Sequence, residues 1–489
     1  MLWKGMQLYR KNTGRTEQMT DIQYYLDTFE VSVPQLERLT ATALAHGGDF
    51  ADLYFEYTTF FNLLMKDGVV SAGGFHTDFG VGIRVLKGEK TGYAYSENTA
   101  MGDMIKAAEA ASAIALGADS SRAYAAVCDR KADFYPSCTS WREKEADAFL
   151  PFIRDLEKEI FSKDNRIVKV IIRLSSSVSD VMMFNSLGEL TADSRPMGSV
   201  TATAVFEQDG KTENKSVSRS FRKGAEMICD ELRHEIAQEI VKGIDERFAA
   251  VRPKGGKMNV VMGAGASGIL LHEAMGHAFE ADFNRKGQSI FSGKIGSKVC
   301  PENVSVVDDG TLAYNRGSGN YDDEGVAGEK TYMVKDGILT SYLHDRISAA
   351  WYGIDSTGNG RRENFRYNPI PRMRATYMEN GNADPEGIIA SVKHGIYVDE
   401  FSNGQVKIGE GDFTFFVKSG HLIEDGRLTA PVKDINIIGN GPQALADILA
   451  VGNDLKIDNG TWTCGKEQSV PVSCGMPTVL IDGLIVGGE

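Results

Sequence analysis

Two histidines and a glutamate interrupt an otherwise apolar, helix-forming stretch at residues 268–282, GILLHEAMGHAFEAD. Burying polar side chains in such a stretch costs free energy unless they are satisfied or used. A metal ion accounts for all three, because neutral imidazoles bind zinc and a glutamate beside the first ligand can act as base for a metal-bound water. We therefore interpret His272 and His277 as metal ligands and Glu273 as a general base. Ordinary buried histidines are the alternative interpretation.

The spacing of the two histidines constrains the local backbone. They are five residues apart, whereas the common zinc-peptidase pattern H-E-x-x-H places them four apart on one helix face. Five steps of a regular α-helix turn a side chain by roughly 140°, so His272 and His277 would point apart. A local π-type turn would bring them into register, and Gly276 is where a helix deforms at low cost. The spacing predicts a distorted or interrupted helix between them.

The stretch resembles the zinc-binding motif of the TldD/PmbA family of metallopeptidases, in its TldD-like, motif-bearing branch. Other separated segments are similar to the same family and occur in the right order from about residue 50 to the end. They are residues 51–56 (ADLYFE), 80–84 (GVGIR) through 91–94 (TGYA), 322–325 (DDEG), 371–373 (PRM), 439–442 (GNGP), and 464–466 (CGK) followed by 468–472 (QSVPV). One departure is local: Arg374-Ala375-Thr376 follows the PRM segment, where the family pattern leads us to expect an Asn-Thr-like pair.

The resemblance implies a site in which His272, His277 and Cys464 bind zinc and Glu273 is the catalytic base. From the residues alone, nothing local favours Cys464 over Cys474 as the third ligand. Three protein ligands leave a fourth position for water, which is typical of a catalytic zinc. Cys474 as a fourth ligand would instead make the zinc structural.

The resemblance further implies a metalloendopeptidase-type hydrolase that acts on unfolded or short peptides. It implies a dimer, either a homodimer or a heterodimer with a PmbA-like paralogue. The first alternative is a non-catalytic or structural-zinc subunit of such a complex. A nucleotide-dependent enzyme is a more distant alternative, suggested by GAGASG at residues 263–268. The helix after this turn carries histidines rather than belonging to a βαβ unit. We therefore expect a tight turn that lets the helix start close to other backbone.

Charge and composition exclude several classes of function. The net charge of −14 opposes direct binding to nucleic acid, which relies on basic surface. No apolar run approaches the roughly eighteen residues of a membrane span, so we expect no membrane contact. The N-terminus lacks the features of a secretory signal, which favours the cytoplasm. Six cysteines in 489 residues do not make a disulfide scaffold.

The pattern of segments predicts an α+β protein. We expect a disordered leader at 1–18, a mixed α/β amino-terminal region at 19–250 with a split near 140, and a carboxy-terminal metallopeptidase domain at 251–489. The last should be mainly antiparallel, barrel-like, and carry the metal-binding helix. Helices are predicted at 34–46, 101–116, 143–162, 225–249 and 442–450.

Several other polar side chains have two interpretations. Glu280 and Asp282 could orient a ligand imidazole or be solvated carboxylates, and the second interpretation is favoured for Asp282. Glu280 is also a weaker alternative for the third ligand. His344 could stabilise an oxyanion, although a surface histidine at a strand end is favoured. The arginines between 361 and 366 could bind a peptide carboxylate, with a solvated basic patch as the default.

Overall fold

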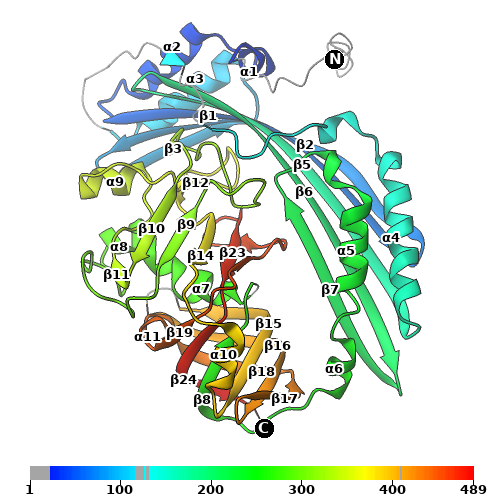
Figure 1. Ribbon diagram of the computed structural model, residues 1–489. Helices are drawn as coiled ribbons and strands as arrows, with labels where there is room; N and C mark the ends of the chain where they lie inside the picture. Colours follow the sequence, from blue (N-terminus) through cyan, green and yellow to red (C-terminus); the bar gives the residue numbers. More distant parts are fainter. Residues whose placement is uncertain (1–21, 116–125, 128–131, 266, 408–409, 489) are drawn as a thin grey trace.

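The computed structural model describes residues 22–115, 126–127, 132–265, 267–407 and 410–488. The N-terminal half, residues 22–249, is built on a seven-stranded sheet with the path β3-β2-β1-β5-β6-β4, and β7 also pairs with β6. Its strands are β1 (Phe50–Lys66), β2 (Val69–Lys87), β3 (Lys90–Ser96), β4 (Ala126–Val127), β5 (Ile167–Asn185), β6 (Glu189–Gln208) and β7 (Lys211–Phe221). Four of them are 17 to 20 residues long, so the sheet runs from the upper left to the lower right of Figure 1.

The two faces of this long sheet meet different partners. Successive side chains of a strand point to opposite faces. Along β1, Leu53, Phe55 and Leu63 belong to the cores beneath the helices. Tyr54 and Glu56 point the other way, towards the C-terminal half. The first face is covered by α1 (Ile22–Thr28), α2 (Val33–Ala43) and α3 (Met101–Ser112) at one end and by α4 (Leu150–Lys163) and α5 (Asp230–Glu239) at the other.

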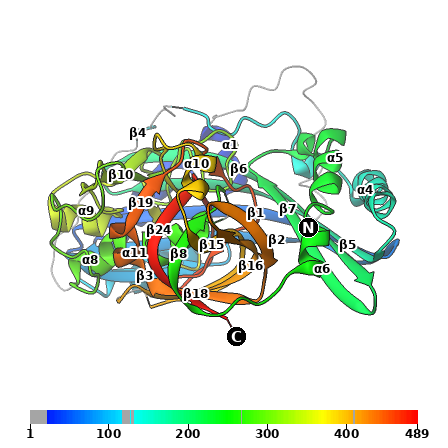
Figure 2. The same ribbon diagram turned by 60° about the horizontal axis from the view of Figure 1, so that its bottom comes forward.

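The C-terminal half, residues 256–488, contains two larger sheets. One has six strands in the order β11-β10-β9-β14-β23-β20. In the other, β15-β8-β24-β18-β16 follow one another and β16 pairs back with β15, which closes these strands into a barrel. Figure 2 shows these barrel strands from below. Both sheets are mainly antiparallel, although β8 with β15 and β14 with β23 are parallel pairs.

The strands of the six-stranded sheet are β9 (Val306–Asp309), β10 (Lys330–Lys335), β11 (Ile338–Leu339), β14 (Ala375–Met378), β20 (Lys456–Ile457) and β23 (Ser473–Met476). Those of the barrel sheet are β8 (Gly256–Met262), β15 (His394–Val406), β16 (Asp412–Glu424), β17 (Arg427–Val432), β18 (Ile435–Asn440), β19 (Ile448–Val451) and β24 (Val479–Gly487). Two short hairpins complete the strands, β12 (Gly360–Arg361) with β13 (Ile370–Pro371) and β21 (Thr463–Cys464) with β22 (Val470–Pro471). The remaining helices are α6 (Ile244–Ala249), α7 (Gly268–Ala274), α8 (Ala281–Arg285), α9 (Arg346–Tyr352), α10 (Pro385–Ala390) and α11 (Gly441–Ala446).

Helix α7, which carries the first histidine, is buried between the two C-terminal sheets. It contacts β14 and β23 of the six-stranded sheet and β15 of the barrel. A Cβ atom on Gly268 would lie 2.6 Å from the backbone of Gly475, so only glycine allows this approach. Gly268, whose N–H donates to Gly265 O at 2.9 Å, therefore lets the helix start against other backbone, as predicted.

The two halves of the molecule meet through buried polar contacts. The backbone N–H of Phe365 donates to Glu56 Oε2 at 2.9 Å, and its carbonyl accepts from Tyr93 Oη at 2.6 Å. Arg84, which is fully buried, pairs with Asp52 of its own half and with Glu324 of the other at 2.7 Å. The site described below is thus part of a C-terminal half that is tied firmly to the long sheet.

The predicted fold class is confirmed: the chain is α+β, with a barrel in a mainly antiparallel C-terminal half. The single helix predicted at 225–249 is wrong. Gly243 adopts a left-handed conformation (φ 73°) and separates α5 from α6. The predicted leader at 1–18 lies outside the described residues, and the domain limits stay a prediction. Among the described residues, no helix is long and apolar enough to cross a membrane.

Candidate metal centre

The helix that carries His272 ends before it reaches His277. Helix α7 stops at Ala274, and residues 276–279 form a 3-10 turn. A Cβ atom on Gly276 would lie 2.3 Å from Met373 Sδ, so any larger residue where the chain turns would have to displace the Met373 side chain. The predicted interruption is confirmed, but a tight 3-10 turn takes the place of the π-type turn that we considered.

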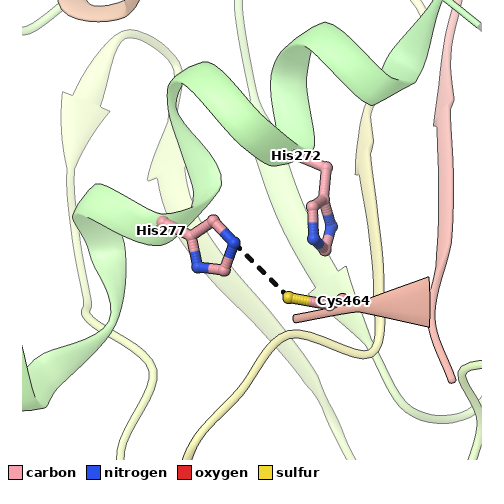
Figure 3. Close-up of side chains that lie close together, drawn as sticks. All are labelled: His272, His277 and Cys464. Atoms are coloured by element: carbon pink, nitrogen blue, oxygen red, sulfur yellow. Dashed lines mark hydrogen bonds between the residues drawn. The ribbon is translucent and has the colours of Figure 1, made fainter. Parts of the chain in front are cut away.

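His272, His277 and Cys464 come together at this interruption. The candidate ligand atoms of the three residues all lie within 4.8 Å of one another. Figure 3 shows both rings turned towards the cysteine sulfur, which comes from the β21–β22 hairpin. The two rings lie 5.3 Å apart between centroids, and Cys464 Sγ lies 3.4 Å from His277 Nε2. All three side chains are buried, with exposed fractions of 0%, 4% and 1% respectively.

The hydrogen bonding of His272 fits a bound metal. Its Nδ1 and Nε2 atoms are both buried and neither has a hydrogen-bond partner among the described residues. A buried imidazole in this condition is costly unless something else completes it. Two imidazoles and a thiol are a donor set that suits zinc. The residues present therefore fit the ion that the sequence predicted.

Glu280 fixes the ring of His277 from behind. Its Oε2 lies 2.8 Å from His277 Nδ1 and 3.1 Å from Lys466 Nζ. Because Nδ1 is engaged, Nε2 is left facing Cys464, which is how ligand histidines are usually oriented. Lys466 Nζ also donates to Asp282 Oδ1 at 2.8 Å. Glu280 thus orients the imidazole, and the favoured interpretation of Asp282 as a solvated carboxylate is wrong.

Opposite charges hold these groups ionised despite their burial. Burial would raise the pKa of the Cys464 thiol, but His272 and His277 outweigh it and lower that pKa to about 4. Burial would lower the pKa of His277, but Glu280 and Cys464 raise it to about 10. Lys466 and His277 likewise overcome burial and lower the pKa of Glu280 to about 2. Cys464 is therefore held as a thiolate, the form that binds metals.

Glu273 lies beside this cluster without belonging to it. Its Oε1 is 4.0 Å from His272 Nε2, and its Oε2 is 3.9 Å from His277 Nε2. Its side chain keeps 29% exposure, in contrast to the buried cluster residues. A carboxylate in this position can reach a water molecule next to the cluster, which is what a general base requires.

Two side chains that the sequence analysis left without a role hold Cys464 in place. Arg372 is fully buried, and its two terminal nitrogens donate to the carbonyls of Gln468 and Cys464 at 2.7 Å each. Lys466 connects the same turn to Glu280. Arg372 and Lys466 each lie in a segment that carries the family resemblance. Their positions in these segments could have indicated a role at the site.

The other candidates lie outside the cluster. Cys474 is a free, buried thiol on β23 and is not among the grouped ligands, so it is not brought to the site as a fourth one. His344 is 1% exposed rather than a surface residue, and burial lowers its pKa to about 4. Arg361 and Arg362 are buried as well, so the expected solvated patch is wrong for them. Arg366 does lie nearer the surface, where it pairs with Asp78 and Glu97.

Comparison with known sequences identifies three consecutive family domains. PmbA/TldA metallopeptidase domain 1 matches residues 51–115, the central domain matches 140–244, and the C-terminal domain matches 255–488. A metalloprotease TldD homolog from Haemophilus influenzae is 38% identical over 452 residues, which is 90% of this chain and 93% of that protein. A metalloprotease from Methanothermobacter thermautotrophicus is 30% identical over 448 residues, 90% of this chain and 96% of that protein.

The fold has solved counterparts. The crystal structure of TldE from Thermococcus kodakarensis superposes with a TM-score of 0.72 over 93% of this chain and 100% of that one, at 18% identity. This likeness concerns the fold alone. The sequence matches carry the assignment, since the family domains cover most of the chain and a curated relative is 38% identical over 90% of it. The chain therefore belongs to the TldD/PmbA family of metallopeptidases.

Proposed function

We propose that this chain is a zinc-dependent peptidase that hydrolyses peptide bonds in unfolded or short peptides. The observation that carries the proposal is the buried group of His272, His277 and Cys464, in which neither ring nitrogen of His272 has a hydrogen-bond partner in the part of the chain that the structure describes. Relatives named metalloproteases support the same class of enzyme.

The proposal gives each side chain a role. His272, His277 and Cys464 would hold the zinc ion. When bound, zinc supplies a Lewis acid that acidifies water and polarises a scissile carbonyl. Glu273 accepts a proton from the attacking water and passes it to the leaving amine, because its carboxylate lies about 4 Å from both imidazoles and stays partly exposed. Glu280 and Lys466 keep His277 oriented throughout.

The alternative is a non-catalytic or structural-zinc subunit of a TldD/PmbA-type complex. A structural zinc is closed by four protein ligands. Among the described residues the group of candidate ligands contains three, and Cys474 stays outside it. A zinc ion held by these three residues would keep a fourth position for water, which favours the catalytic role.

Several further features belong to the same proposal. We infer a dimer, either of this chain with itself or with a PmbA-like paralogue, a view that the fold similarity to a protein named TldE supports. We also retain a cytoplasmic location, no direct nucleic-acid contact at a net charge of −14, and a domain boundary near residue 250.

The test compares zinc content and peptide hydrolysis in the wild type, Glu273→Gln and His272→Ala. The wild type and Glu273→Gln should each bind about one zinc per chain, measured by atomic emission after gel filtration. Cleavage of an unstructured peptide should fall at least a hundredfold in Glu273→Gln, because loss of a general base costs roughly 10²–10⁴ in rate. His272→Ala should lose the zinc itself.

His394→Ala is the matched control, because His394 is an exposed histidine outside the cluster. It should keep both zinc and activity. If the wild type binds zinc yet cleaves nothing, the assay is repeated with a PmbA-like partner added. Zinc binding without cleavage in that mixture would support the structural-zinc alternative, and a wild type without zinc would end the proposal.

A further inference from the structure

A cavity of about 270 Å³ lies between the long sheet and the C-terminal half, next to the hairpin that carries Cys464. This is far more than the ~15 Å³ that a single water molecule needs. Tyr54, Thr58 and Ser179 line it from the long sheet, on the face without helices. Thr463, Val470 and Pro471 of the β21–β22 hairpin line it from the other half.

The charges around this cavity are unbalanced. Six arginines line it, against three carboxyl groups, although the whole chain has a net charge of −14. Arg195 pairs with Asp323 across the contact between the halves, and Arg362 reaches across it to Asp52 at 3.8 Å and to Tyr93 Oη at 3.2 Å, so both are accounted for. The other four are Arg222, Arg316, Arg361 and Arg374.

None of these four arginines forms an ion pair within 4.0 Å among the described residues. Arg361 donates to the carbonyls of Met373 and Pro471, and Arg374 donates through Nε to Gly358 O. Arg222 lies with its guanidinium 5.3 Å from the ring centroid of Tyr135. The Nε atom of Arg222 and one terminal nitrogen of Arg374 are buried without any hydrogen-bond partner among the described residues.

The carboxyl groups that face the cavity do not neutralise the four. The Asp323 carboxylate is engaged by the Arg195 guanidinium and by the backbone N–H of Arg362, and Glu363 accepts from the backbone N–H of Ser469. Burial raises the pKa of Glu56 to about 7, so this carboxyl holds its proton part of the time at neutral pH. Burial and repulsion from the neighbouring Arg222 guanidinium lower the pKa of Arg316 to about 10. Buried, uncompensated charges are destabilising unless a counter-ion completes them.

The arginines also connect the cavity to the candidate metal centre. Arg316 donates to the carbonyl of Trp462 and to the hydroxyl of Thr463, and Arg361 donates to the carbonyl of Pro471. These contacts lie on both strands of the hairpin that presents Cys464, and Thr463 is its neighbour in sequence. A group bound among the arginines would therefore lie close to the cluster.

We propose that this arginine-lined cavity binds a carboxylate of the peptide substrate, with Arg222, whose guanidinium donates no hydrogen bond among the described residues, as the free donor. The inference rests on the proposed peptidase function. Guanidinium groups bind carboxylates through paired, charge-assisted hydrogen bonds. A carboxylate is also the anion that a peptide with a free terminus always carries. Both the C-terminal carboxylate and an acidic side chain offer this chemistry, and the experiment separates them.

The experiment measures binding without turnover, in the zinc-loaded full-length chain carrying Glu273→Gln. Three fluorescein-labelled nonapeptides of Gly, Ala and Ser are titrated by fluorescence anisotropy: one with a free C-terminal carboxyl, one amidated, and one amidated with an internal glutamate. The free acid should bind at least about tenfold more tightly than the amide, as expected for loss of charge-assisted hydrogen bonds. Recovery of affinity by the internal glutamate would show that side-chain carboxylates also enter.

Arg222→Met, added to Glu273→Gln, should abolish the preference for the free acid. Arg219→Met is the matched control, because Arg219 lies on β7 three residues away and pairs with Glu235 outside the cavity. Equal binding of all three peptides would overturn the inference even if the arginine variant failed to fold. Selective binding combined with a wild type that cleaves no peptide would overturn the peptidase function and leave the carboxylate site standing.

Discussion

Two buried groups of charged and polar side chains differ in whether each member has a partner of opposite charge. Where the two halves meet, Arg84 lies between Asp52 and Glu324, and all three are within the molecule with almost no exposure. In the candidate metal centre, His272 is equally buried and neither of its ring nitrogens has a hydrogen-bond partner among the described residues, although Glu273 Oε1 lies 4.0 Å from its Nε2. The charges of the first group are paired within the chain, although Asp52 Oδ1 and one terminal nitrogen of Arg84 also lack a hydrogen bond in the described part of the chain, whereas both ring nitrogens of His272 are left without one.

This difference distinguishes buried polar groups that stabilise the fold from those that serve a function. A buried ion pair regains roughly what its desolvation costs, so the chain can keep it without any ligand. An unpartnered buried group persists where a function requires it. Changes at the interface should therefore alter the free energy of unfolding and leave zinc binding intact, and changes around the cluster should do the reverse.

The largest effect on stability should come from Arg84→Met. This change removes the cation that pairs with both Asp52 and Glu324. Among the described residues, the other cation within ion-pair distance of the two carboxylates is Arg362, at 3.8 Å from Asp52. An uncompensated buried charge costs about 3–5 kcal/mol. Urea denaturation should show a loss of this size, and the folded fraction should still bind zinc.

Lys87→Met is the control for that experiment, because Lys87 lies on the same strand but pairs with Asp49 at the surface. An exposed pair of this kind contributes about 0–1 kcal/mol. If both variants lose the same small amount of stability, the interface network has no structural role. If Arg84→Met folds normally but loses zinc, the separation between the two groups is wrong.

The second effect concerns Glu56, an interface carboxyl outside the ion pairs. It accepts from Thr58 Oγ1 at 2.7 Å and from the backbone of Phe365, and burial raises its pKa from the usual 4.5 to about 7. Between these values the folded protein holds a proton that the unfolded chain has released. The free energy of unfolding should therefore fall as the pH rises from about 4.5 to 7 and level off above, by roughly 3 kcal/mol.

Glu56→Gln keeps the hydrogen-bond acceptor and removes the titration. Denaturation midpoints measured from pH 4 to pH 8 should lose this downward slope in the variant. Glu302→Gln, at an exposed position, should keep it. An unchanged slope in Glu56→Gln would mean that another group causes the pH dependence.

Local features of the site could be predicted from the sequence more fully than contacts between distant segments. The five-residue spacing of the histidines was enough to predict a broken helix, because it depends only on helix geometry and on Gly276. The contacts of the break are less local, because Met373 packs where a Cβ of residue 276 would lie. Since Met373 is far away in sequence, no local pattern could show this contact.

The same limit explains what was missed around the cluster. A choice between Cys464 and Cys474 could be made from the family resemblance but not from the residues themselves, because it depends on which loop returns to α7. Arg361 and Arg362 resemble a solvated patch in sequence, yet both are buried, Arg362 over the ring of Tyr54 on the long sheet and Arg361 against the carbonyls of Met373 and Pro471. Burial produced by one half on the other cannot be seen in the composition of either segment.

The smallest effect is expected from Lys466→Met. This change removes a charge pair, the feature typical of the interface, from inside the metal centre. Lys466 Nζ lies 3.1 Å from Glu280 Oε2 and 2.8 Å from Asp282 Oδ1, and Glu280 in turn holds His277 Nδ1. Without the ammonium group, Glu280 is a buried carboxylate with less support and His277 is oriented less firmly.

Loss of such an outer contact typically weakens metal affinity about 10–100-fold. Competition against a chromophoric chelator measures this affinity directly. Lys286→Met, at an exposed position near Asp282, should change this affinity far less. An unchanged zinc affinity in Lys466→Met would mean that the hairpin alone positions Cys464 and that His277 needs no support from this pair. The metal centre would then depend on the backbone of β21 and β22 more than on the charges around it.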